Sequence, residues 1–175
     1  MKSKLPLIFL LILFISDFPG IAFSQDSLSD EDLQYLQGSW TGTLTYLDYT
    51  TNIPYSMPSD VEIVRIDSMR NYLFKRIYPD EPQANSYDTV AFSLDGAMIN
   101  DEKIVSKKYL QNGTVEFITE INGIDGNDVK PALIRHNYTL GEEIFIISKD
   151  VKFKDQSDWI NRHVYKYKRS HSDKR

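Results

Sequence analysis

The sequence has no cysteine among its 175 residues. This absence excludes disulfides, thiolate zinc sites, iron–sulfur clusters and a cysteine nucleophile. Basic residues are also in deficit, since 20 Lys and Arg stand against 25 Asp and Glu, and a net charge of −5 argues against a nucleic-acid partner. The sequence contains no nucleophile elbow, glycine-rich phosphate loop or paired-carboxylate motif. With 41% hydrophobic and 26% charged residues, the composition is typical of one globular domain.

The N-terminus has the pattern of an export signal. Lys2 and Lys4 precede an apolar run over residues 5–15, and Ala22-Phe23-Ser24 has the small-x-small pattern of a cleavage site. These features predict a secretory signal peptide over residues 1–24, with cleavage before Gln25. An uncleaved anchor is the alternative, but the apolar run is shorter than the roughly 20 residues that a spanning helix needs. We therefore expect a secreted or periplasmic protein without a membrane span.

Polar and apolar residues alternate with a period of two through most of the remaining chain. This pattern, rich in aromatic and β-branched residues, predicts antiparallel strands. Asn112-Gly113 lies between two such runs and indicates a tight hairpin. The alternation predicts nine strands, at residues 40–46, 61–66, 72–78, 88–92, 104–110, 115–121, 133–140, 144–153 and 159–168.

Only the segment from Ser29 to Leu36 has a helical period, and Ser27 or Ser29 can cap a short helical turn there. A long meander must protect its edge strands, and closure into a barrel does so. We predict an all-β antiparallel meander of about 8–10 strands closed into a barrel; a sandwich is the alternative. The predicted single domain spans residues 25–168 and is followed by a basic disordered tail over residues 169–175.

Gly38-Ser39-Trp40 directly follows the helical turn and opens the first strand. This motif resembles the Gly-x-Trp start of the lipocalin-like (calycin) β-barrels. The resemblance implies that Gly38 and Trp40 form a structural plug at one end of the barrel, with a basic residue of the last strand stacked on the indole: Lys166, Lys168 or Arg169. The sequence also resembles exported proteins of Bacteroidetes-type bacteria that carry no assigned activity.

Two histidines are predicted to face the barrel interior. His136 shares a strand face with Tyr138, and His163 shares one with Trp159 and Tyr165. Such a pair can serve as metal ligands, as a haem ligand or as an acid–base pair. It can equally be two core histidines hydrogen-bonded to tyrosines. The spacing matches no metal motif, so we predict neither a metal site nor a cofactor.

Arg76 is predicted on the same inward face as three aromatic residues, Tyr72, Phe74 and Tyr78. A buried guanidinium needs a carboxylate partner or a ligand anion, and Asp150 is one candidate partner. Alternatively, Arg76 lies near the barrel mouth and reaches water. By strand alternation Arg162 is expected to point outward.

These residues support three hypotheses. The first is an exported barrel that binds a small apolar or amphipathic ligand through Arg76, Tyr72, Phe74, Tyr78, His136, Tyr138, His163 and Tyr165. The second is an interaction or structural module whose barrel is filled by its own side chains. The third is an enzyme that uses His136 and His163, although no catalytic residue can be assigned. The oligomeric state is not predicted.

Overall fold

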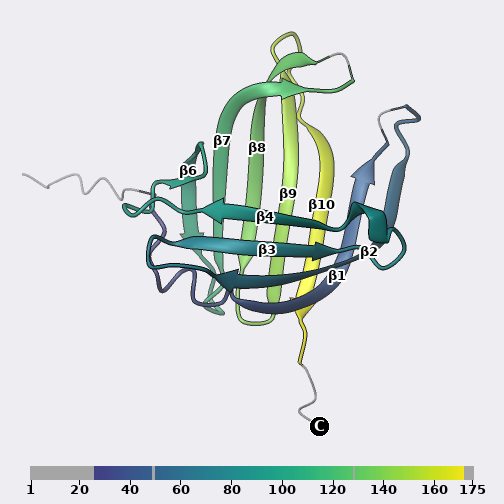
Figure 1. The fold of residues 1–175 in the computed structure, drawn as a ribbon. Helices are drawn as coiled ribbons and strands as arrows, with labels where there is room; N and C mark the ends of the chain where they lie inside the picture. The colour runs from purple at the N-terminus through teal and green to yellow at the C-terminus, as the bar shows by residue number, and fades with distance from the viewer. Residues whose placement is uncertain (1–25, 49, 128, 172–175) are drawn as a thin grey trace, which may run out of the picture.

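A computed structural model describes residues 26–48, 50–127 and 129–171. These residues form one antiparallel sheet of ten strands, and the single 3-10 helix assigned among them is η1 (Pro82–Ala84). The all-β prediction is confirmed (Figure 1). The strands are β1 (Gly38–Leu47), β2 (Pro54–Arg65), β3 (Asn71–Ile77), β4 (Ser86–Ala91), β5 (Met98–Ile99), β6 (Glu102–Tyr109), β7 (Val115–Asp125), β8 (Lys130–Leu140), β9 (Ile144–Phe153) and β10 (Ile160–Arg169).

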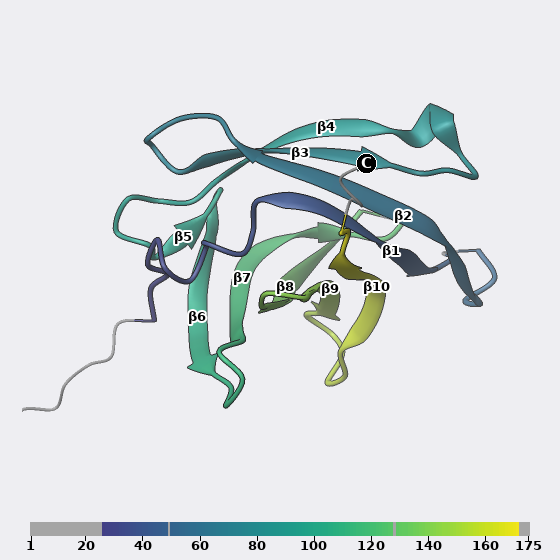
Figure 2. The ribbon, with the colours of Figure 1, turned by 90° about the horizontal axis from the view of Figure 1, so that it is seen from below.

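The strands form a meander that is nearly closed into a barrel. Almost every strand pairs with its neighbours in sequence, and the last strand, β10, pairs with the first, β1. The remaining seam lies between β4 and β5. There, Phe92 and Ile99 form an isolated bridge, and the Asn100 amide donates to the Ala91 carbonyl over 2.7 Å. Figures 1 and 2 show β1–β4 crossing over the long strands β7–β10, so that the two groups enclose the interior.

Two strands differ most from the predicted pattern. β2 begins at Pro54, seven residues before the predicted start, and contains Pro58. Proline is tolerated because β3 pairs with β2 only from Asp60 to Arg65, which leaves the first half of β2 at an edge. β5 has only two residues, too few to produce an alternating pattern.

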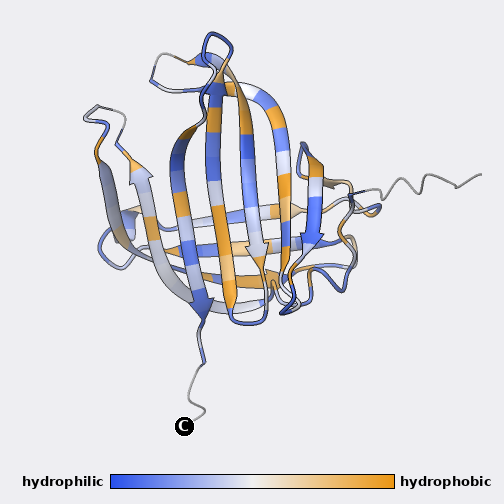
Figure 3. Ribbon diagram, turned by 180° about the vertical axis from the view of Figure 1, so that it is seen from behind, coloured by the Kyte–Doolittle hydropathy of each residue, from blue (hydrophilic) through white to orange (hydrophobic). Residues whose placement is uncertain are grey.

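The core fills the lower part of the barrel with large apolar side chains, including Trp40, Tyr72 and Phe145, which are at most 2% exposed. Orange and blue bands alternate along the strands in Figure 3, as expected for an apolar inner face and a polar outer face.

The N-terminal segment covers one end of the barrel. The Ser29 amide donates to the Asp32 carboxylate and the Asp32 amide to the Ser29 hydroxyl, over 2.7 and 3.2 Å. This reciprocal cap starts a series of turns rather than a regular helix. The turns insert Leu28, Leu33 and Leu36 into the core.

Trp40 closes the same end. Its indole N–H donates to the Leu36 carbonyl over 3.1 Å, and the Arg169 guanidinium lies 3.9 Å from its ring centroid. Arg169 also donates to the carbonyls of Tyr35 and Gln37. Gly38 has a φ of +123°, and a Cβ there would lie 2.7 Å from the Arg169 guanidinium, so this arrangement requires glycine.

The ends of the chain can be placed only in part. The predicted signal peptide, Gln25 and residues 172–175 lie outside the described residues. Arg169, which was predicted to begin the tail, is instead the last residue of β10, and the Ser170 amide donates to the Ser39 carbonyl. Within the described part of the chain, no helix has the length and apolar character needed to cross a membrane.

Candidate functional site

The barrel interior contains a cavity of about 200 Å³. Its walls come from the N-terminal turns and from strands on both sides of the barrel, so the fold brings together residues that are far apart in sequence. The lining residues are Leu33, Leu36, Phe74, Arg76, Val90, Phe92, Ile99, Asn100, Glu102, Phe117, His136, Tyr138, Leu140, Phe145, Ile147, His163 and Tyr165. Six of the eight predicted ligand-binding residues line this cavity; Tyr72 and Tyr78 do not.

Aromatic rings form much of the wall. Phe117 and Tyr138 stack face to face, with ring centroids 4.5 Å apart and an interplanar angle of 11°. Phe74 and Phe145 lie 6.4 Å apart on the opposite part of the wall. Such rings offer both apolar area and flat faces to a bound molecule.

A carboxylate–histidine pair lies at the polar side of the cavity. Glu102 Oε2 is 2.8 Å from His136 Nδ1, and the same carboxylate accepts a hydrogen bond from Thr119. Burial raises the pKa of Glu102, but the hydrogen bonds from His136 and Thr119 outweigh burial and hold the pKa below its ordinary value. The carboxylate therefore fixes the orientation of the His136 ring.

His163 lies beside this pair without a hydrogen bond. Its ring is 6.4 Å from that of His136 and 5.3 Å from that of Tyr165, centroid to centroid. Within residues 26–48, 50–127 and 129–171, no protein group forms a hydrogen bond with its imidazole. Burial lowers the pKa of His163 to about 4, and the nearby His136, Lys149 and Arg76 act in the same direction. Neither histidine is hydrogen-bonded to a tyrosine, the arrangement expected for two core histidines.

Arg76 lines the cavity from β3 and is already paired. Its guanidinium forms an ion pair and hydrogen bond with Asp88 of β4, and it lies 5.4 Å from the Phe74 ring centroid and 5.8 Å from that of Tyr165. The candidate partner Asp150 instead accepts hydrogen bonds from two asparagines on the neighbouring strands, Asn137 and Asn161.

The tyrosines of the predicted site have different roles. The Tyr78 and Tyr165 hydroxyls are 3.0 Å apart, so Tyr78 supports a lining residue from behind. Tyr72 is 2% exposed and packs edge-on against Phe92 in the core. Burial raises the pKa values of Tyr138 and Tyr165. Both side chains are therefore neutral hydrogen-bonding groups at neutral pH.

A second polar cluster contains Asp125, Lys149 and Arg162. The prediction that Arg162 points outward is wrong. Asp125 accepts from Lys149 and from Arg162, each over 2.7 Å, and the Arg162 side chain is only 8% exposed. The pairing of β10 with β9 shifts by one residue between Asn161 and His163. Because a bulge reverses the alternation beyond it, Arg162 faces inward.

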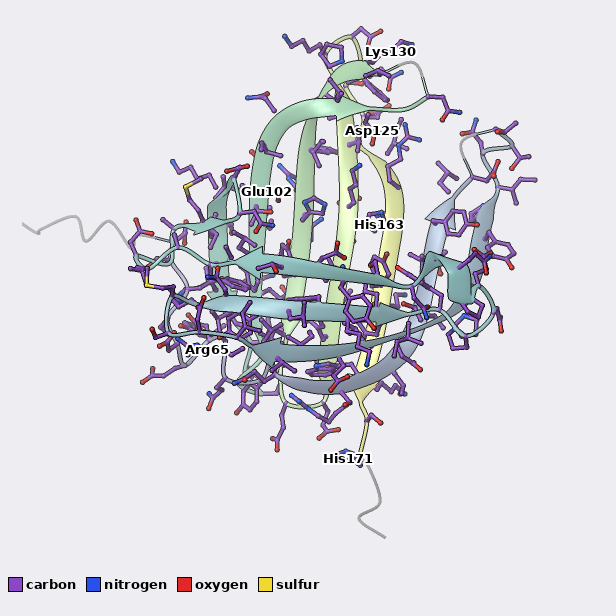
Figure 4. The ribbon with its side chains drawn as sticks, viewed as in Figure 1. Arg65, Glu102, Asp125, Lys130, His163 and His171 are labelled. Atoms are coloured by element: carbon purple, nitrogen blue, oxygen red, sulfur yellow. The ribbon has the colours of Figure 1, made fainter. Side chains whose placement is uncertain are left out.

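The same bulge separates Trp159 from His163, which were predicted to share a face. The Trp159 ring instead stacks on Arg135, with 4.1 Å between the guanidinium carbon and the ring centroid. In Figure 4, His163 and Glu102 lie at a similar height on either side of the long strands, and Asp125 lies nearer the top.

Glu102 was missed by sequence reasoning. It precedes the predicted strand start at Ile104, but it lies two positions before Ile104 and therefore on the same face of β6. Extension of the alternation by one period would have placed this carboxylate inside. Among the described residues, no group of three or more His, Asp or Glu side chains is arranged to hold a metal ion.

Comparisons with known proteins establish the fold alone. The sequence matches no protein-family model and no curated protein. A solved structure with a similar fold is the crystal structure of Rv2717c from M. tuberculosis, with a TM-score of 0.52 and 10% sequence identity over 80% of this chain and 98% of that chain. The barrel is thus shared with a solved structure, whereas membership of the lipocalin-like family stays a prediction.

Proposed function

We propose that the barrel binds one small amphipathic molecule in its interior cavity. The observation that carries the proposal is the placement of His163, whose imidazole borders a cavity with aromatic walls and has no hydrogen-bond partner in the described chain. A polar group in such a place costs free energy unless a ligand or water satisfies it. A side chain that only filled the core would be satisfied by its neighbours.

The size of the cavity limits the ligand. An apolar cavity of about 150 Å³ holds benzene, so a cavity of about 200 Å³ holds one ring with a small substituent. A buried ring removes roughly 150–200 Å² of apolar surface from water, worth about 4–5 kcal/mol, which corresponds to a dissociation constant near 1 mM. Tighter binding therefore requires the polar side chains of the wall.

The arrangement at the closed end supports a lipocalin-like assignment within the same proposal. Trp40 plugs that end, Arg169 stacks on it from the last strand, and Gly38 permits the contact. The N-terminal pattern supports the further proposal that the protein is exported after cleavage before Gln25. Fractionation of producing cells, with N-terminal sequencing, tests this: a cytoplasmic product that retains Met1 would contradict export.

Native mass spectrometry of the purified protein, together with an absorbance scan, tests ligand binding. We expect a defined excess mass when the protein is sprayed with a millimolar excess of a single-ring aromatic compound, and organic solvent should release it; a Soret band would identify haem as the cargo instead of a single-ring compound. Val90→Phe places a larger side chain in the cavity wall and is expected to abolish the excess mass. Val64→Phe is the matched control, because Val64 is 45% exposed on the outer face.

Arg76→Ala separates a binding role from a structural role. We expect it to weaken binding of the added compound, because the guanidinium packs on the Phe74 and Tyr165 rings of the cavity wall. We expect little change in melting temperature, because its partner Asp88 is exposed. Lys75→Ala, on the opposite face of β3, is the control. A bare polypeptide mass for the wild type, with no binding of added small aromatic compounds, would favour the filled barrel.

A further inference from the structure

The two charged side chains on the cavity wall already have polar partners. Two formally charged side chains line the cavity, Arg76 and Glu102. Arg76 pairs with Asp88, and Glu102 pairs with His136 over 2.8 Å. A charged ligand would have to break one of these pairs or remain without a counterion in a partly desolvated site, and both cost free energy.

His163 differs from these side chains, because no group in the described part of the chain forms a hydrogen bond with its imidazole. At neutral pH its imidazole is uncharged, because burial lowers its pKa to about 4. A neutral imidazole donates one hydrogen bond and accepts another, so it can satisfy a hydroxyl group without any transfer of charge. The ring lies near those of His136 and Tyr165 and lines the cavity.

The remaining wall favours a flat apolar body. The stacked pair Phe117 and Tyr138 and the rings of Phe74, Phe92 and Phe145 all line the cavity. Aromatic rings prefer offset-stacked or edge-to-face contacts with other rings, which adds to the free energy of area burial. A volume of about 200 Å³ admits one such ring.

We infer that the ligand of this cavity is an uncharged aromatic compound of a single ring, whose hydroxyl or equivalent group forms a hydrogen bond with His163. The inference rests on the proposed function and names the class of molecule that the cavity takes.

Four small probes test the inference by isothermal titration at pH 7: phenol, toluene, benzoate and benzylamine. Phenol and toluene have nearly the same size and differ in the hydroxyl. We expect phenol to bind about tenfold more tightly than toluene, the effect of one hydrogen bond to an otherwise unpaired group, and both to bind more tightly than the two charged probes.

His163→Leu is expected to remove the preference for phenol while toluene still binds. This variant loses no hydrogen bond to the protein, and retained toluene binding demonstrates that its barrel is folded. His171→Ala is the matched control, because His171 is exposed outside the barrel and its loss should change neither affinity.

The outcomes separate the inference from the proposed function. If toluene binds the wild type as tightly as phenol, or benzoate binds most tightly, the cavity binds ligands but the inference is wrong. If phenol keeps its preference in His163→Leu, His163 is not the anchor and the inference is also wrong. If none of the four probes binds, the inference and the proposed function both fail.

Discussion

Acidification from about pH 7.5 to about pH 5 is expected to destabilise the protein through His163. Its pKa is about 4 in the folded protein and 6.5 when the group is freely solvated. Between these values the unfolded chain binds a proton that the folded chain excludes, so the free energy of unfolding falls as the pH falls. The contribution is fully present above pH 6.5 and is lost progressively toward pH 4.

The magnitude follows from the two pKa values. The difference between the two pKa values corresponds to about 3 kcal/mol, of which about 2 kcal/mol is lost by pH 5. Glu102 affects stability over a lower range of pH. Its pKa is depressed below the ordinary value of 4.5, so its contribution is present above that pH and is lost below it.

Urea denaturation at both pH values, monitored by tryptophan fluorescence, measures this effect in the wild type and in His163→Leu. We expect the wild type to lose about 2 kcal/mol more than the variant between the two pH values. His171→Ala should retain the wild-type loss, because this side chain is exposed. Equal pH dependence in wild type and His163→Leu would refute the assignment of a buried, neutral His163.

Two further predictions concern stability. Arg169→Lys should lower the free energy of unfolding by about 2 kcal/mol in urea denaturation, because an ammonium group cannot both cover Trp40 and donate to several carbonyls. Lys168→Ala, at an exposed position of the same strand, should change this free energy little. An unchanged stability of Arg169→Lys would contradict the role of Arg169 in the plug. Asp125→Ala should cost about 3 kcal/mol in the same assay, because the variant removes a buried carboxylate that accepts hydrogen bonds from both Lys149 and Arg162. A loss under 1 kcal/mol, no larger than for a surface ion pair, would contradict this role of the carboxylate.

The strands could be predicted from the sequence where polar and apolar residues alternate without interruption. The Asn112-Gly113 hairpin forms as expected between β6 and β7, with Gly113 at a φ of +78° and the Leu110 amide hydrogen-bonded to the Thr114 carbonyl. The sequence also allowed a prediction about the closed end of the barrel, because Gly38 and Trp40 form a recognisable motif at the start of the first strand. Arg169, which lies on Trp40, was one of three basic residues named for that contact.

Bulges limit what alternation can predict. A single extra residue between Asn161 and His163 brings Arg162 inward, whereas strict alternation predicts that Arg162 faces solvent. A second shift between Ile104 and Ser106 interrupts β6 in the same way. The residue types in these two segments do not indicate the extra residue of a bulge, because a bulge depends on how neighbouring strands pair and not on local propensity.

The register in which the strands pair could not be predicted from the sequence either. Arg76 meets Asp88 because β3 and β4 pair in a register that places Phe74 opposite Asp88. The contact between Glu102 and His136 joins β6 to β8 across the intervening strand, β7. These contacts depend on the register in which neighbouring strands pair, which the alternation of residues along one strand does not specify.

The central claim is that a small molecule binds inside the barrel, and an NMR titration with toluene tests it most directly. The competing site is the apolar groove on the outer surface, which is lined by Thr41, Gly42, Ile144 and Ile146 among others. We predict saturable shifts at Phe117, His136 and His163, with the outer groove unchanged. Shifts confined to the outer groove, or no saturable shift at any concentration up to about ten times the expected millimolar dissociation constant, would contradict the claim.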